Sequence, residues 1–161
     1  MPSFPTCVVL LALPAISKAS PIAAEWGVAK DARLEVHEGR LHVEAQAGAV
    51  IETAAPLDWT GVGSLELSLH SECEVAIELL LVEDDRNAWY WRRVDLASGD
   101  NKLSLPLAWF RWSDGTPVPD WSEVDRVAIR FRDEAGLELG ALATEPGSPL
   151  LGAEQLASVA E

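Results

Sequence analysis

Hydrophobic and polar residues alternate with a period of two from about residue 33 to residue 144. This period is typical of β-strands that bury one face and expose the other. In residues 64–70 every second residue is leucine, and residues 74–83 repeat the pattern with Val, Ile and Leu. Other segments with this pattern are residues 33–37, 41–45, 49–53, 88–96, 102–107, 126–132 and 137–144. The chain is therefore predicted to form about nine short strands, the first two joined in a hairpin by a turn at residues 38–40.

Short strands separated by turns, with no long amphipathic helix, predict an all-β fold. The expected architecture is a two-sheet antiparallel sandwich, either a jelly roll or immunoglobulin-like. The Cys–Trp–Cys signature of immunoglobulin domains is absent, which favours the jelly roll. We place this domain in residues 25–145. Pro146 and Pro149 follow the last predicted strand and end it. Residues 146–161 are therefore expected to form a tail or one short helix.

The first nineteen residues are similar to an export signal. The apolar residues 7–16 are too few to span a bilayer, and small residues at Ser17 and Ala19 suit cleavage after Ala19. No Lys or Arg precedes the apolar stretch, as it does in most signals, so a buried N-terminal strand is the alternative. We expect residues 1–19 to be a signal peptide and the protein to be secreted or periplasmic. Cys73 would then be the single cysteine, which excludes an internal disulfide.

Charge and aromatic content narrow the range of partners. Twelve Lys and Arg against 26 Asp and Glu give a net charge of −14. An acidic surface repels phosphate backbones and anionic lipids, so we expect no nucleic-acid partner, and we also expect no membrane span. Seven residues are Trp, against three Phe and one Tyr. Because indole rings provide flat contact surfaces as well as core packing, this excess indicates a ligand- or partner-binding surface.

Several segments match one family in the same order. Residues 57–69 (LDWTGVGSLELSL) resemble the D-W-S/T-G-x-x-x-L-x-L-x-L opening of galactose-binding-like β-sandwiches. Residues 91–107 resemble their V-x-L-x-x-G-x-N-x-L-x-I-P-L segment, and residues 121–129 and 137–141 resemble the strands that follow. The family includes carbohydrate-binding modules of bacterial glycoside hydrolases and domains similar to the complex I intermediate-associated protein. The resemblance implies a galactose-binding-domain-like fold over residues 33–144. Gly140 departs from it, since the family usually has Asp there.

Strand alternation divides the side chains between two faces. The expected core face holds Leu65, Leu67, Leu69, Val75, Ile77, Leu79, Leu81, Tyr90, Val94, Leu96, Leu103, Leu105, Val127, Ile129 and Phe131. The opposite face holds Glu66, Ser68, His70, Glu78, Leu80, Trp89, Trp91, Arg93, Asp95, Arg126, Arg130 and Arg132. This second face combines tryptophans with guanidinium and carboxylate groups, a mixture that suits a sugar. Pyranose C–H faces lie flat on indole rings, while charged side chains bond the hydroxyls.

Trp89 and Trp91 lie about 7 Å apart on one strand, at a rise of about 3.4 Å per residue, which fits one or two sugar units. The predicted ligand-binding residues are Trp89, Trp91, Arg93, Glu78, Arg130 and Trp112. The alternative is that the N-terminal segment or a partner covers the Trp89–Trp91 pair, with Arg93 stacked on it.

A second aromatic cluster occupies the loop of residues 108–121. Prolines stiffen this loop, but in similar domains such a segment crosses between strands and plugs the end of the sandwich. We therefore expect Phe110 or Trp109 to be buried and Trp112 to be the most exposed. Trp59 is expected to fill the core.

Catalysis and metal binding have little support in the sequence. The three histidines lack metal-ligand spacing and no nucleophile motif adjoins them, so we predict no enzyme activity. Residues 83–85 could hold a structural Ca²⁺, although a solvated acidic turn is the simpler interpretation, and no other cofactor is expected. The leading hypothesis is a secreted, non-catalytic carbohydrate-binding module. The alternative is a protein-interaction or accessory module that uses the same face to dock a partner or a second copy.

Overall fold

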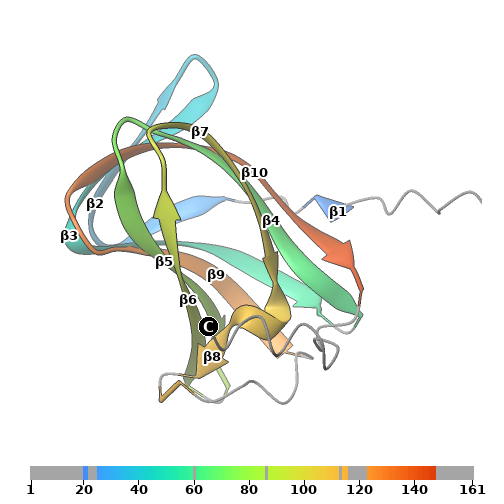
Figure 1. The fold of residues 1–161 in the computed structure, drawn as a ribbon. Coiled ribbons are helices and arrows are strands. Elements are labelled where there is room, and N and C mark those ends of the chain that lie inside the picture. The colour runs from blue at the N-terminus through green and yellow to red at the C-terminus, as the bar shows by residue number, and fades with distance from the viewer. Residues whose placement is uncertain are drawn as a thin grey trace, which may run out of the picture.

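The computed structural model describes residues 20–21, 25–59, 61–85, 87–112, 114–115 and 123–147. These residues form antiparallel strands and a single 3-10 turn, which confirms the all-β prediction (Figure 1). The elements are β1 (Ser20–Pro21), β2 (Trp26–His37), β3 (Arg40–Asp58), β4 (Val62–Ser71), β5 (Val75–Glu83), β6 (Ala88–Leu96), β7 (Gly99–Pro106), η1 (Leu107–Trp109), β8 (Arg111–Trp112), β9 (Glu123–Phe131) and β10 (Ala135–Pro146). The predicted signal segment, residues 1–19, and residues 148–161 of the predicted tail lie outside the described residues.

The strands form one continuous sheet that curls into two layers (Figure 1). Its order is β7-β4-β10-β3-β9-β5-β6-β8, with β1 paired to β10 and β2 paired to β3. The long strand β3 belongs to both layers, because its residues 41–45 pair with β10 and its residues 50–58 pair with β9. This arrangement is the predicted two-layer antiparallel jelly-roll sandwich.

Strand β3 differs from the sequence prediction, which had two strands at residues 41–45 and 49–53. The structure has one strand of 19 residues. Gly48, with a φ of 82°, lies between the part that pairs with β10 and the part that pairs with β9. Glycine adopts positive φ without strain, so the strand changes layer here without ending. The predicted hairpin turn is confirmed, with Glu38 and Gly39 at the positive φ of a tight two-residue turn.

The core between the layers consists of the positions that alternation predicted. All are buried except Val94 and Leu103, which pack half-buried against the others. Trp59 and Phe110 have no exposed surface, so the predictions for these two side chains are confirmed. Burying large apolar side chains is the main favourable contribution to folding. Two faces therefore remain for function, one on the outside of each layer.

The final strand explains why glycine occupies position 140. A bulge shifts the pairing of β10 with β4 between Leu139 and Leu142, and the Ala141 N–H donates to Ser68 Oγ at 2.8 Å. A Cβ on Gly140 would lie 2.5 Å from Ser68 Oγ and 2.9 Å from the Ser68 carbonyl oxygen. The close approach of the two strands leaves no room for the Asp found there in similar domains.

Candidate functional site

The outer surface of β9, β5, β6 and β8, together with the second half of β3, carries both predicted tryptophans. We call this surface the tryptophan face. Strand pairing places its side chains in three rows across the layer. The central row is Glu52, Ala128, Leu80, Trp91 and Arg111, and the rows beside it are Val50, Arg130, Glu78, Arg93 and Ala54, Arg126, Val82, Trp89. All the predicted ligand-binding residues except Trp112 therefore lie together.

The two tryptophans differ in how they are held. Trp89 is 42% exposed, which makes it one of the few large apolar side chains on the described surface. Trp91 is half-buried, and its indole N–H donates to the carbonyl oxygen of Trp112 at 3.0 Å. Leu80 and Ala128 are buried although they point outward, because neighbouring side chains cover them. The face thus has an apolar floor with one fixed and one exposed indole ring.

Trp112 lies on the other side of the layer from Trp91. It pairs with Tyr90 across β6 and β8, and their rings make an edge contact with centroids 4.6 Å apart. Trp112 is half-buried against the core instead of standing on the exposed surface. Arg111 takes the outward position beside Trp91, and sequence reasoning missed it. Alternation would have identified Arg111 only if the pairing of this two-residue strand with β6 had been known. Trp121 lies outside the described residues.

In the row beside Trp91, the buried carboxylate of Glu78 bonds two arginine side chains. The side chain of Glu78 is only 5% exposed, and it accepts hydrogen bonds from Arg130 and pairs with Arg132 Nε at 3.3 Å. Next to it, Arg93 Nε and Nη2 both donate to Asp95 Oδ1 at 3.1 Å. A buried charge is tolerated when oppositely charged groups bond it. The guanidinium groups of Arg130 and Arg132 are consequently held against Glu78, while their outer edges reach solvent.

Arg126 holds the opposite end of the face. Its guanidinium donates to Glu52 and to both carboxylate oxygens of Asp84, and the hydrogen bond to Asp84 raises the pKa of Arg126. Asp84 belongs to the acidic turn considered for calcium. Among the described residues, no group of three or more His, Cys, Asp or Glu side chains is arranged to hold a metal ion. Asp84 instead serves as an ion-pair partner of Arg126.

The face ends in a hollow beside Arg93. This hollow has a volume of about 480 Å³, and Ala76, Asp95 and Asp133 line it together with Arg93. Ala76 pairs with Asp95 one row beyond Glu78, so the hollow continues the rows of the tryptophan face. The hollow lies in line with Trp89, Trp91 and Arg93 along β6.

The outer surface of the other layer holds all three histidines. We call the outer surface of β2, the first half of β3, β10, β4 and β7 the histidine face. Sequence alternation had grouped His70, Glu66 and Ser68 with the tryptophans, and the structure corrects this, because β4 lies in the other layer. A single row crosses five strands here: Glu35, His42, Glu138, His70 and Asp100. Alternation assigns a side chain to a face of its own layer but does not say which layer.

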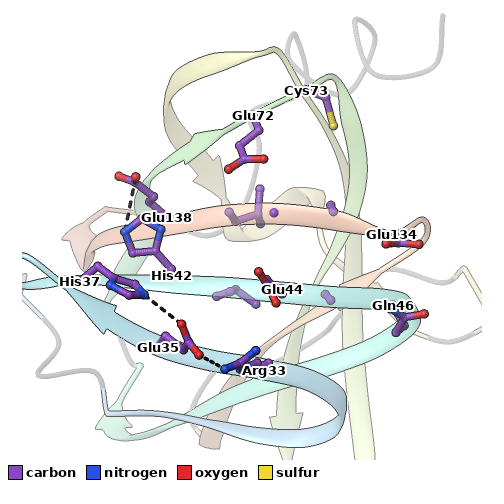
Figure 2. A pocket seen from close by; sticks show the side chains of 15 residues that line it. Arg33, Glu35, His37, His42, Glu44, Gln46, Glu72, Cys73, Glu134 and Glu138 are labelled. Carbon is purple, nitrogen blue, oxygen red and sulfur yellow. Dashed lines mark hydrogen bonds and ion pairs between the residues drawn. The ribbon is translucent and has the colours of Figure 1, made fainter.

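Figure 2 shows a cleft on this face, with a volume of about 660 Å³. His42 Nε2 lies 3.6 Å from Glu138 Oε1, and His37 Nε2 lies 2.9 Å from Glu35 Oε2. Arg40 donates to Glu138 at 3.0 Å, and this hydrogen bond is the main cause of a lowered Glu138 pKa. The rings lining the cleft are imidazoles, so the cleft lacks the flat apolar surface on which a sugar ring stacks.

Solved structures share this architecture. The chain superposes on the structure of PfGH50B with a TM-score of 0.64 and 15% identity, covering 82% of this chain and 24% of that one. A variant of CBM29-2, a family 29 carbohydrate-binding module, gives a TM-score of 0.55 and 12% identity over 85% of this chain and 97% of the other. The family 11 carbohydrate-binding module of the cellulase Lic26A-Cel5E of Clostridium thermocellum gives 0.53 and 10% identity over 81% and 86%.

The chain has the galactose-binding-like β-sandwich fold of carbohydrate-binding modules. The fold expected from the sequence resemblance is therefore confirmed. The chain spans about a quarter of the length of PfGH50B and of the agarase AgWH50C. No protein-family model matches the sequence, and a search of curated proteins found no match. In the described part of the chain, no helix has the length and apolarity needed to cross a membrane.

Proposed function

We propose that this chain is a non-catalytic carbohydrate-binding module and that it binds a glycan on the tryptophan face. The observation that carries the proposal is the pair Trp89 and Trp91 on one strand, bordered by guanidinium–carboxylate pairs. Fold neighbours described as carbohydrate-binding modules, one of them complexed with cellulohexaose, support it. The resemblance to part of an agarase supports the same class of ligand.

Sugar recognition would divide between stacking and hydrogen bonding. The exposed ring of Trp89 offers its face to the C–H side of a pyranose, and Trp91 adds a second ring about 7 Å along the strand. Arg93 and Arg130 donate to hydroxyl oxygens, while carboxylate oxygens accept from hydroxyl hydrogens. Trp112 contributes indirectly, because its carbonyl holds the Trp91 indole.

Preorganisation favours binding at this face. Long charged side chains lose conformational entropy when a ligand fixes them, which weakens binding. Here ion pairs with the partly buried Glu52 and the buried Glu78 hold Arg126 and Arg130 in one arrangement before a ligand arrives. These carboxylates are engaged by arginines, which suits hydrogen-bond acceptors better than the proton donor that a glycoside hydrolase requires. The proposal is thus of a binding module without catalysis.

Export is part of the proposal. A glycan-binding module meets polysaccharides outside the cytoplasm, and the apolar residues 7–16 followed by Ser17 and Ala19 provide the expected signal. Expression of the full chain in a bacterial host should deliver the protein to the periplasm or medium with Ser20 as the first residue. N-terminal sequencing of the exported protein tests this, and recovery of the uncleaved chain in the cytoplasm would contradict it.

Calorimetric titration with cellohexaose and agarohexaose, after a glycan-array screen, tests binding. The variants Trp89→Ala and Trp91→Ala should each weaken affinity about tenfold or more, since one stacked ring contributes about 0.5–1.5 kcal/mol beyond its buried area. Trp26→Phe, whose ring packs against the core and not on the outer face, is the matched control and should bind normally. Absence of binding across the array, or equal affinity in all variants, would overturn the proposal. A dimer in light scattering that Trp91→Ala dissociates would instead support protein docking at this face.

A further inference from the structure

On the histidine face, strand β10 has one outward side chain, Glu138, between two glycines. Its consecutive outward positions are Gly136, Glu138 and Gly140. Glycine has no side chain, so on β10 only Glu138 projects from this stretch, and the side chains of Glu72 and Ser68 lie close to the two glycines. The cleft of Figure 2 includes Gly136, and a second hollow of about 230 Å³ includes Gly140.

These hollows join into one groove. A third hollow, of about 590 Å³, is lined by His37, Arg40 and His42. Glu138 lines all three hollows, so they adjoin one another at this side chain. With neighbouring strands about 4.8 Å apart, the row from Glu35 to Asp100 crosses four spacings, or about 19 Å. The groove is thus long enough for a chain of several units and not only for a single small molecule.

The groove wall alternates between carboxylates and imidazoles. The order across the strands is Glu35, His42, Glu138, His70 and Asp100. Contacts hold the row in place: His70 Nδ1 lies 2.8 Å from Asp100 Oδ1, and Glu138 contacts both Arg40 and His42. Glu138 is 26% exposed, so its carboxylate remains accessible to a ligand. Leu69 and Leu139, which also line the hollow beside Gly140, are buried, so no large apolar side chain projects from this row.

This lining selects the chemistry of the ligand. A strongly charged ligand would have to separate one of the existing pairs, such as Arg40–Glu138 or His70–Asp100, before it could bind. A neutral polyhydroxylated chain would not, because each hydroxyl both donates and accepts a hydrogen bond. A docked protein would need accessible apolar anchors, which the hollows do not supply.

We propose that the histidine face is a second carbohydrate-binding site, which takes a neutral oligosaccharide along the groove across β10. It would make the module bivalent, with one site on each layer. Recognition here depends on hydrogen bonds alone, unlike the stacking proposed for the tryptophan face. The inference adds to the proposed function, and its test separates the two.

The histidines provide a selective probe of this site. The chain has three histidines and all of them lie on the histidine face, so imidazole NMR signals report on this face alone. Titration of the full chain with cellohexaose and agarohexaose should shift the His42 and His70 signals in a saturable manner. The same shifts should persist in Trp91→Ala, because that ring lies on the other layer. Glu138→Gln should weaken the response about tenfold, since it removes a charge-assisted acceptor while keeping the shape. Glu145→Gln, on the same strand outside the groove, is the matched control.

Each outcome decides one of the two sites. If the imidazole signals shift for neither hexasaccharide while the tryptophan variants weaken binding, this inference is wrong and the proposed function stands. If the imidazole signals shift while Trp89→Ala and Trp91→Ala bind normally, the groove is a site and the proposal for the tryptophan face is wrong. Thermal unfolding of Glu138→Gln, which should match the parent protein, excludes misfolding as the cause of a lost response.

Discussion

The two outer faces of this sandwich contain similar side chains in different settings. On each face a row of side chains crosses five strands, and each face contains a glutamate that is bonded by basic neighbours. On the tryptophan face the glutamate is Glu78, whose side chain is 5% exposed. On the histidine face it is Glu138, which is 26% exposed and lies between two glycines. Equivalent ion pairs therefore have different energetic roles.

The difference in exposure between Glu78 and Glu138 follows from the residues around each side chain. Neighbouring groups enclose the Glu78 side chain almost completely, whereas hollows adjoin Glu138 on both sides. A covered carboxylate depends on its protein partners because water cannot replace them. An open carboxylate exchanges partners with water at little cost, which also makes it available to a ligand. Structural stability should accordingly be more sensitive to charge changes on the tryptophan face.

Glu78→Ala should have the largest effect and tests this difference directly. The variant leaves Arg130 and Arg132 without their shared carboxylate, and we expect a loss of about 2–3 kcal/mol in the free energy of unfolding. This is less than the full cost of breaking a buried pair, because both guanidinium groups reach solvent. Chemical denaturation measures it. Glu138→Ala on the histidine face is the matched control and should unfold like the parent, so equal losses in both variants would contradict the comparison.

Gly140→Ala should cause the next largest loss of stability, and it tests how closely β10 and β4 pack beside the groove on the histidine face. A methyl group at this position would lie 2.5 Å from Ser68 Oγ and 2.9 Å from the Ser68 carbonyl oxygen. Main-chain atoms cannot move aside easily, so we expect a loss of about 2 kcal/mol. Gly136→Ala is the matched control. Its methyl group would meet the end of the Glu72 side chain at 3.3 Å, and that side chain can rotate away. Equal stability of both variants would show that β10 and β4 adjust.

The sequence predicted the inside of the fold better than the outside. Alternation identified the buried residues because it depends only on which face of a strand meets the core, as for Leu65 and Ile77. It could not assign the outward residues to a layer, since that depends on strand order. His70 was therefore grouped with Trp91, although the two lie on opposite sides of the molecule.

The aromatic loop shows a second limit. Arg111 and Trp112 form a two-residue strand, which is too short for a periodic pattern. Their directions follow from pairing with Trp91 and Tyr90, which are about twenty positions earlier in the chain. The groove on the histidine face was missed for a related reason. Gly136 and Gly140 indicate a groove only when the row of side chains from neighbouring strands is known.

Trp91→Phe should have a smaller effect and examines how the tryptophan face holds its rings. The variant removes the indole N–H that donates to the Trp112 carbonyl at 3.0 Å while keeping a flat ring. We expect a loss of about 1 kcal/mol in stability, typical of one hydrogen bond. Amide hydrogen exchange in β8 should also become faster, because this bond connects β6 to β8. His42→Gln on the histidine face, whose contact to Glu138 is 3.6 Å, is the control. Unchanged exchange in β8 would mean that strand pairing alone orders it.

Acid should produce the smallest effect and should act through the histidine face. Arg40 and His42 lower the pKa of Glu138 below its ordinary value of 4.5, and a hydrogen bond to His70 lowers the pKa of Asp100 below 3.8. A carboxyl group with a lowered pKa in the folded state stabilises the fold above its unfolded-state pKa. This stabilisation is lost as the pH falls through the folded-state value. The parent protein should thus lose stability as the pH decreases below about 4.5.

The double variant Glu138→Gln, Asp100→Asn should remove part of that dependence. Its stability should equal or fall slightly below that of the parent at neutral pH and decline less in acid, because neither amide can bind the proton that the carboxylates take up. Thermal unfolding across the acid range measures the slope. The change should be small, since both groups lie on the open surface where solvent screens their pairs. An identical slope in parent and variant would mean that the acid response arises elsewhere, with the ion pairs of the tryptophan face as the next groups to examine.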